Sequence, residues 1–207
     1  MRVDLYTFVH KAQRFHMFQI SERIGAADFS DFNEVKEVEE QILQLVEQLK
    51  DHAKNEKNYI HPLLQKIGSV GEHFDKEHEH LEVEIQKIEN AVEEKRWSDL
   101  YRVYNRFLAA YLLHLDEEEA AQRDILWKHY EDQDLAAVFN RFKAERPPHL
   151  AKTDFEFMLP ALSAAELTQI FRGMKMATPS HIFQGACDTA VKILSKSKWQ
   201  KISDAIS

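Results

Sequence analysis

The sequence has only one cysteine, Cys187, so the chain cannot form an internal disulfide bond, which is typical of a reducing compartment. It has 5 glycines and 5 prolines among 207 residues, too few for the many tight turns of a β-sandwich or a β-barrel. No apolar run reaches the length of about 18 residues that a membrane span needs, and residues 1–11 lack the apolar core of a signal peptide. We therefore expect a cytoplasmic protein that does not enter a membrane.

Charge is also informative, because the chain has no cluster of lysine and arginine and its net charge is −8. A nucleic-acid-binding protein is therefore not expected. The acidic excess is unevenly divided: residues 1–130 contain 26 acidic and 17 basic side chains, whereas residues 131–207 are almost neutral. This difference predicts two parts, a domain over residues 1–130 and an extension over residues 131–207.

Amphipathic helices account for most of the first part. In one of them, residues recur in alternating steps of three and four from Val35 to Leu63, the spacing of a buried helical stripe, and all are apolar or aromatic except His52 and Glu56. Asp31 and Ser98 are candidate N-terminal caps. Because the connections are short, we expect an all-α fold in which four helices form an up-down-up-down bundle. The expected helices span about residues 4–24, 32–67, 71–94 and 98–130.

Eight of the eleven histidines lie in the first 114 residues, and helical periodicity divides them into two sets. One histidine in each expected helix lies on the buried stripe, and in two helices a glutamate follows one turn later on the same stripe. The inward set is His10, His52 with Glu56, His78, and His114 with Glu118. The histidines that fall off the stripes are His16, His61, His73 and His80.

The inward set indicates a metal site. An ionised carboxylate removed from water costs several kcal/mol unless it is paired, and the backbone groups of helices already bond to one another. Four imidazoles and two carboxylates directed into one core therefore need a shared counter-charge, which a cation supplies. Imidazole and carboxylate ligands without a thiolate favour iron or manganese.

The order of these residues resembles the haemerythrin-like (HHE cation-binding) family over roughly residues 3–130. Two HxxxE motifs carry the resemblance, one at His52–Glu56 and one at His114–Glu118, with His10 before them and His78 between them. The resemblance implies a pair of non-haem iron ions in a four-helix bundle, with Glu56 and Glu118 as bridging carboxylates and the four histidines as terminal ligands. Manganese and zinc are the alternative metals. The implied small ligand is O2, peroxide or NO, which the protein would bind, sense or react with.

One position departs from the family's oxygen carriers, in which the third helix supplies two histidines four residues apart. Here Phe74 occupies the position one turn before His78. The resemblance then implies two open coordination positions where the carriers have one, which favours peroxide chemistry or sensing. Two alternatives remain open: Glu82 as a substitute ligand, and Glu119 in place of Glu118. The rival functions are a peroxidase-like or catalase-like enzyme and a metal-dependent regulatory module.

The extension over residues 131–207 contains no catalytic pattern. Further helices are expected, one of which begins with a capping box formed by Ser163 and Glu166. Its apolar residues need burial, either against the bundle or in a homodimer, and Cys187 is expected to be a small packed residue. The expected helices span about residues 134–143, 164–174 and 180–195, with a last turn around Trp199.

Overall fold

The structure, a computed structural model, describes residues 2–207; Met1, the first residue of the expected N-terminal domain, lies outside the described residues. The fold is all-helical, with 84% of the chain in helices and no strand among the residues described. The chain divides into two compact units, Met1–Glu145 and Arg146–Ser207. Within the described range, no helix has the length and apolarity that crossing a membrane requires.

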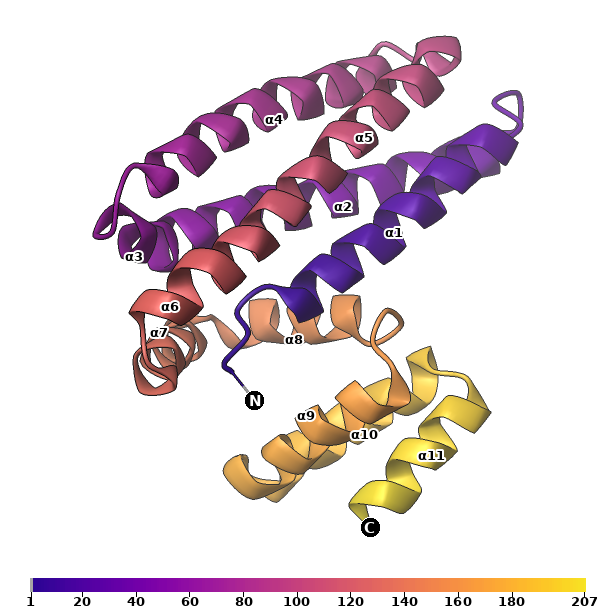
Figure 1. The fold of residues 1–207 in the computed structure, drawn as a ribbon. Coiled ribbons are helices and arrows are strands. Elements are labelled where there is room, and N and C mark those ends of the chain that lie inside the picture. Colours follow the sequence, from indigo (N-terminus) through magenta and orange to yellow (C-terminus); the bar gives the residue numbers. More distant parts are fainter. Residues whose placement is uncertain (1) are drawn as a thin grey trace. The chain divides into compact units, whose positions relative to one another are not determined.

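Four long helices build most of the first unit (Figure 1). α1 contacts α2 and α5, and α4 likewise contacts α2 and α5, so each long helix packs against two others. A short helix follows α2, and a π-helical turn with two further helices follows α5. These elements are α1 (Thr7–Ala26), α2 (Phe32–Tyr59), α3 (His61–Gln65), α4 (Val70–Glu93), α5 (Trp97–Ala121), η1 (Gln122–Leu126), α6 (Trp127–His129) and α7 (Asp132–Glu145).

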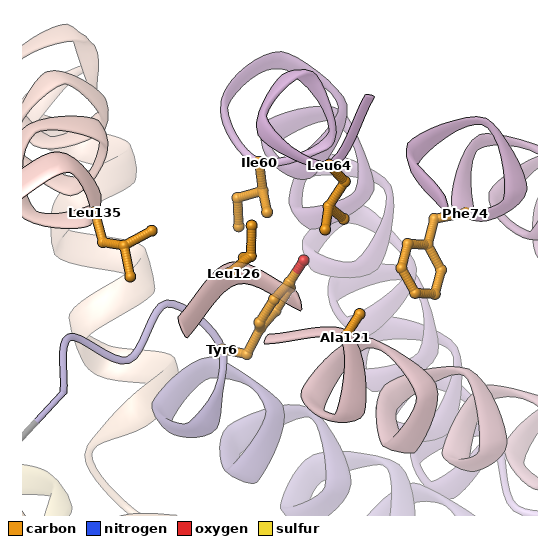
Figure 2. Packing of buried hydrophobic residues seen from close by; sticks show 7 residues of the cluster. All are labelled: Tyr6, Ile60, Leu64, Phe74, Ala121, Leu126 and Leu135. Atoms are coloured by element: carbon orange, nitrogen blue, oxygen red, sulfur yellow. The ribbon is translucent and has the colours of Figure 1, made fainter. Parts of the chain in front are cut away.

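The first unit extends beyond residue 130, the end expected from the charge distribution. α7 is almost neutral, with three acidic and two basic side chains, yet it contacts α2. Leu135 of α7 is fully buried in a cluster with Ile60 and Leu126 (Figure 2). Packing of apolar side chains thus assigns α7 to the first unit, because compact units are defined by their cores and not by their net charge.

The expectation of one continuous helix over residues 32–67 is wrong, because α2 ends at Tyr59 and α3 begins at His61. Pro62 lies in the first turn of α3 and has no N–H to donate to a carbonyl one turn earlier, so the α2 hydrogen-bond pattern cannot continue through it. The break rotates the residues that follow. His61, expected to point outward, is fully buried.

The helix starts show which capping signals were reliable. The Asp31 side chain accepts hydrogen bonds from the N–H groups of Asn33 and Glu34, which confirms it as the cap of α2. Ser98 is not a cap, because α5 already begins at Trp97. The capping box of Ser163 and Glu166 is confirmed.

The second unit has a small aromatic core of its own. Phe171 is fully buried, and its ring contacts the rings of Phe155, Phe183 and Trp199. Cys187 is a free, buried thiol, as expected. No helix is expected from the sequence between residues 143 and 164, yet α8 begins there at Pro148, because proline is well suited to the first turn of a helix. The helices are α8 (Pro148–Met158), α9 (Ala164–Ala177), α10 (Ser180–Ile193) and α11 (Lys196–Ile206).

Gly71 determines how closely α3 approaches α4. A Cβ atom at this position would lie 2.7 Å from the carbonyl oxygen of His61 and 2.6 Å from Cγ of Gln65. We predict that Gly71→Ala lowers the free energy of unfolding by about 1–3 kcal/mol, because the backbone of α3 must move.

Gly68→Ala is the matched control, because a Cβ atom at Gly68 would meet no atom within 4 Å. Chemical denaturation of both variants measures the difference. Equal stabilities would show that the close approach at Gly71 is unimportant.

Candidate metal centre

Glu56 and Glu118 lie at the centre of the candidate site. They come from α2 and α5, and their side chains are only 1% and 0% exposed. Each is placed by the helical repeat, since Glu56 is one turn from His52 and Glu118 is one turn from His114. Two ionisable carboxylates are therefore buried in the same part of the core.

Histidine nitrogens surround the two carboxylates on one side. The Nε2 atom of His52 lies 2.9 Å from Oε1 of Glu56. The Nε2 atom of His10 lies 3.7 Å from that same oxygen and 3.4 Å from Oε2 of Glu118. His10, His52, Glu56 and Glu118 thus form one group of potential metal ligands, which we call group 1.

The other oxygens of the same two carboxylates face a second set of histidines. The Nε2 atom of His78 lies 3.4 Å from Oε2 of Glu56 and 3.4 Å from Oε1 of Glu118. His61 belongs to this group as well, with Glu56, His78 and Glu118. The Nε2 atom of His114 lies 2.9 Å from Nε2 of His78 and 3.1 Å from Oε1 of Glu118. We call these five residues group 2.

All six residues expected from the sequence as ligands therefore lie together, and His61 joins them. Among the four histidines expected to point outward, His73 and His80 are exposed as expected and His16 is half-buried. His61 was missed because the sequence was interpreted as one helix through Pro62. Pro62 was a signal for the end of α2, although it does not indicate in which direction His61 points.

Three of these histidines have a carboxylate on the ring nitrogen that faces away from the cluster. The Nδ1 atom of His61 lies 2.8 Å from Asp75, that of His114 lies 3.0 Å from Glu77, and that of His10 lies 3.1 Å from Glu119. Such a partner holds the proton on Nδ1 and directs the Nε2 lone pair inward, the usual arrangement of metal-binding histidines.

Contacts with the histidines also distinguish Glu118 from its neighbour Glu119. Both oxygens of Glu118 face the histidines, whereas Oε1 of Glu119 accepts hydrogen bonds from His10 and, at 2.6 Å, from Arg14. The His10 hydrogen bond and Arg14 lower the pKa of Glu119 to about 2. Glu82, the other open alternative, is exposed and lies in neither buried group.

The buried histidines and glutamates shift one another's pKa values, and these shifts oppose the effect of burial. Burial alone would lower the pKa values of His10 and His78, but nearby carboxylates raise them to about 9 and about 10. Burial alone would raise the pKa of Glu56, yet His52, His10 and His78 hold it well below its usual value. In the protein without metal, histidine protons therefore balance the two carboxylates.

Hydrogen bonding leaves many of these atoms without a partner. Among the described residues, both oxygens of Glu56, both oxygens of Glu118 and the Nε2 atoms of His10, His52 and His61 are buried and have none. Buried polar atoms are normally hydrogen-bonded, and an unpaired one costs about 1–3 kcal/mol. These atoms lie close together but are not aligned as donor and acceptor.

A cleft of about 310 Å³ opens between α2 and α4 beside the cluster. Its lining includes two nearly buried residues, His78 and Tyr111. Exposed lysines of α2 line it together with acidic residues of α4, among them Lys54 and Glu82. Solvent thus approaches the cluster on the His78 side.

Comparisons with models of protein families, with curated proteins and with solved structures give no match. The functional argument for this chain therefore depends on the side chains just described.

We predict that His61→Ala lowers the metal affinity of the centre by at least about 10-fold, because removing even an outer partner of a ligand typically costs 10–100-fold. The matched control is His80→Ala, which removes an exposed imidazole from α4. Titration with Fe(II) or Zn(II), followed by isothermal calorimetry, measures both affinities. Equal affinities in the two variants would exclude His61 as a ligand.

Proposed function

We propose that the first unit is a haemerythrin-like, up-down-up-down four-helix bundle that binds two non-haem iron ions. The observation that carries this proposal is the set of buried carboxylate and imidazole atoms of groups 1 and 2 that have no hydrogen-bond partner. The contacts of α1, α2, α4 and α5 with one another support the bundle.

The distances between donor atoms support cations and not a simple hydrogen-bond network. Donor atoms that surround one cation at about 2.1 Å lie about 3.0–3.4 Å from one another in octahedral or tetrahedral geometry. The neighbouring donor atoms of both groups lie between 2.9 and 3.7 Å apart. One ion in each group would therefore give a partner to the unpaired carboxylate and imidazole atoms, which lie within 4.8 Å of one another in each group of four that the structure brings together.

The two carboxylates support a pair of ions and not a single one. In both Glu56 and Glu118, one oxygen faces group 1 and the other faces group 2. In this proposal His10 and His52 would hold one ion, His61, His78 and His114 would hold the other, and Glu56 and Glu118 would contribute to both. His61, whose ring centroid lies 5.9 Å from that of Phe74, supplies the histidine that is missing at position 74.

The donor set favours iron. Imidazole suits several transition metals, carboxylate suits hard cations, and the cluster contains no thiolate. With His61 included, the number of open coordination positions returns to that of the family's oxygen carriers. Iron bound at such a site would exchange electrons with small molecules that contain oxygen or nitrogen.

The protein's own residues supply binding and shielding. Tyr6, Phe74 and Tyr111 are nearly buried around the cluster and exclude water from most of it. The cleft beside His78 has a volume of about 310 Å³, which exceeds that of O2, peroxide or NO. We therefore propose that the centre binds a molecule of this class, as a carrier, a sensor or a peroxide-consuming enzyme.

The first test is metal stoichiometry. The full chain is loaded with Fe(II) without oxygen, unbound metal is removed, and iron per chain is counted before air is admitted. We predict about two ions per chain and near-ultraviolet absorption bands after air is admitted. One ion or none would contradict the proposal of a paired centre.

Consumption of hydrogen peroxide by the loaded protein then favours the enzyme. Bleaching of the spectrum when oxygen is removed favours the carrier.

The role of Glu118 as a bridge has its own test. We predict that Glu118→Gln reduces the iron content to one ion or less, because an amide carries no charge and offers one oxygen donor. The matched control is Glu117→Gln, which changes the neighbouring glutamate, 54% exposed. Metal analysis of both variants decides the point, and full occupancy in Glu118→Gln would exclude a bridging role.

A further inference from the structure

Tyr6 has a hydroxyl group that the protein leaves without a hydrogen-bond partner. The residue is 1% exposed, and its Oη atom is buried and unpaired. A tyrosine in a core usually finds a partner for this group, because an unpaired buried hydroxyl is unfavourable. Phenylalanine would fill the same space without that cost, so the hydroxyl requires an explanation.

No described residue accepts a hydrogen bond from the Tyr6 hydroxyl. Figure 2 shows the Tyr6 side chain in a cluster of apolar residues that includes Ile60 and Leu64. The other members of this cluster are Phe74, Ala121, Leu126 and Leu135. The apolar wall excludes water and leaves the hydroxyl available for an acceptor that is not part of the protein.

Tyr6 also adjoins the metal centre. It lies one helical turn before His10, and the centroids of the two rings are 5.0 Å apart. Burial, and then the negative charges of Glu118 and Glu56, raise the pKa of the Tyr6 hydroxyl well above its usual value. A hydrogen-bond acceptor held at the metal centre would therefore interact electrostatically with the Tyr6 hydroxyl.

The donor count of the two groups indicates where a small ligand has room. Group 2 contains three histidines, whereas group 1 contains two, with the same two carboxylates shared between them. The coordination positions that side chains do not fill are thus more numerous on the His10 and His52 side. Tyr6 contacts His10 on this side.

Hydrogen bonds of the N-terminal segment fix Tyr6 in this position. The N–H of Tyr6 donates to Asp4 Oδ1 at 3.0 Å, and the N–H of Leu5 donates to Oε1 of Gln122 at 2.6 Å. The Nε2 atom of Gln122 in turn donates to Asp4 at 3.1 Å. The segment before α1 is therefore attached to the end of α5, and the ring of Tyr6 is oriented before any ligand arrives.

From these observations we infer that Tyr6 donates a hydrogen bond to a small ligand of the metal pair, one with an oxygen or nitrogen lone pair, such as hydroperoxide or azide. This inference rests on the proposed function, because it requires metal in groups 1 and 2. Tyr6 is in this view a residue that selects ligands by their ability to accept a hydrogen bond, and not one that holds the metal.

The test compares Tyr6→Phe with Tyr104→Phe. Tyr104 is equally buried, at 1% exposure, but its hydroxyl donates to the carbonyl oxygen of Met17 at 3.0 Å. Each variant of the full chain is analysed for iron content, for the midpoint of thermal unfolding without metal, and for azide affinity of the iron(III) form by visible titration.

We predict that Tyr6→Phe keeps its iron, keeps or raises its unfolding midpoint, and binds azide about 3–10-fold more weakly, the loss that one hydrogen bond accounts for. Tyr104→Phe should unfold at a lower temperature and bind azide like the original protein. Azide affinity that is unchanged in iron-loaded Tyr6→Phe overturns the inference about Tyr6 alone, as does a midpoint that falls as far as that of Tyr104→Phe. Absence of iron from the original protein overturns the proposed function and this inference with it.

Discussion

Two buried carboxylates from different helices, Glu56 and Glu118, are the constraint on which the rest of the first unit depends. Ionised carboxylates in a core are unfavourable by several kcal/mol unless they are paired, and neither accepts a hydrogen bond from the described residues. The two carboxylates in turn raise the pKa values of His10 and His78, so protons on these imidazoles compensate the carboxylate charge. A cation would replace those protons, since it uses the same nitrogen lone pairs. Binding of a metal ion would therefore be linked to the protonation of these histidines.

An outer set of carboxylates makes this exchange possible. Asp75, Glu77 and Glu119 each contact the Nδ1 atom of a different histidine, so the Nε2 atoms point inward. These acids lie near the surface, where water compensates much of their charge. Only the two carboxylates that belong to both groups, Glu56 and Glu118, are thus fully buried. The acids that orient the imidazoles avoid the cost of full burial.

Much of the candidate site could be predicted from the sequence, because helical periodicity fixes which side chains share a face. His52 with Glu56 and His114 with Glu118 are one turn apart on long helices, and the structure brings their donor atoms within 3.1 Å. His61 could not be placed by the same rule, since Pro62 ends the repeat on which the rule depends. The extent of the first unit was also misjudged, because net charge does not reveal that Leu135 packs in its core.

Helical periodicity cannot predict that a buried polar group has no hydrogen-bond partner. The sequence places Tyr6 on the same stripe as His10, which fits an ordinary aromatic core residue equally well. Only the structure shows that its hydroxyl, in a cluster with Ile60, Leu64 and Phe74, has no hydrogen-bond partner (Figure 2). Tyr104 has the same side chain and the same burial, yet its hydroxyl donates to a backbone carbonyl. The two tyrosines differ in what the fold offers them as acceptors, and this difference separates a structural hydroxyl from one available to a ligand.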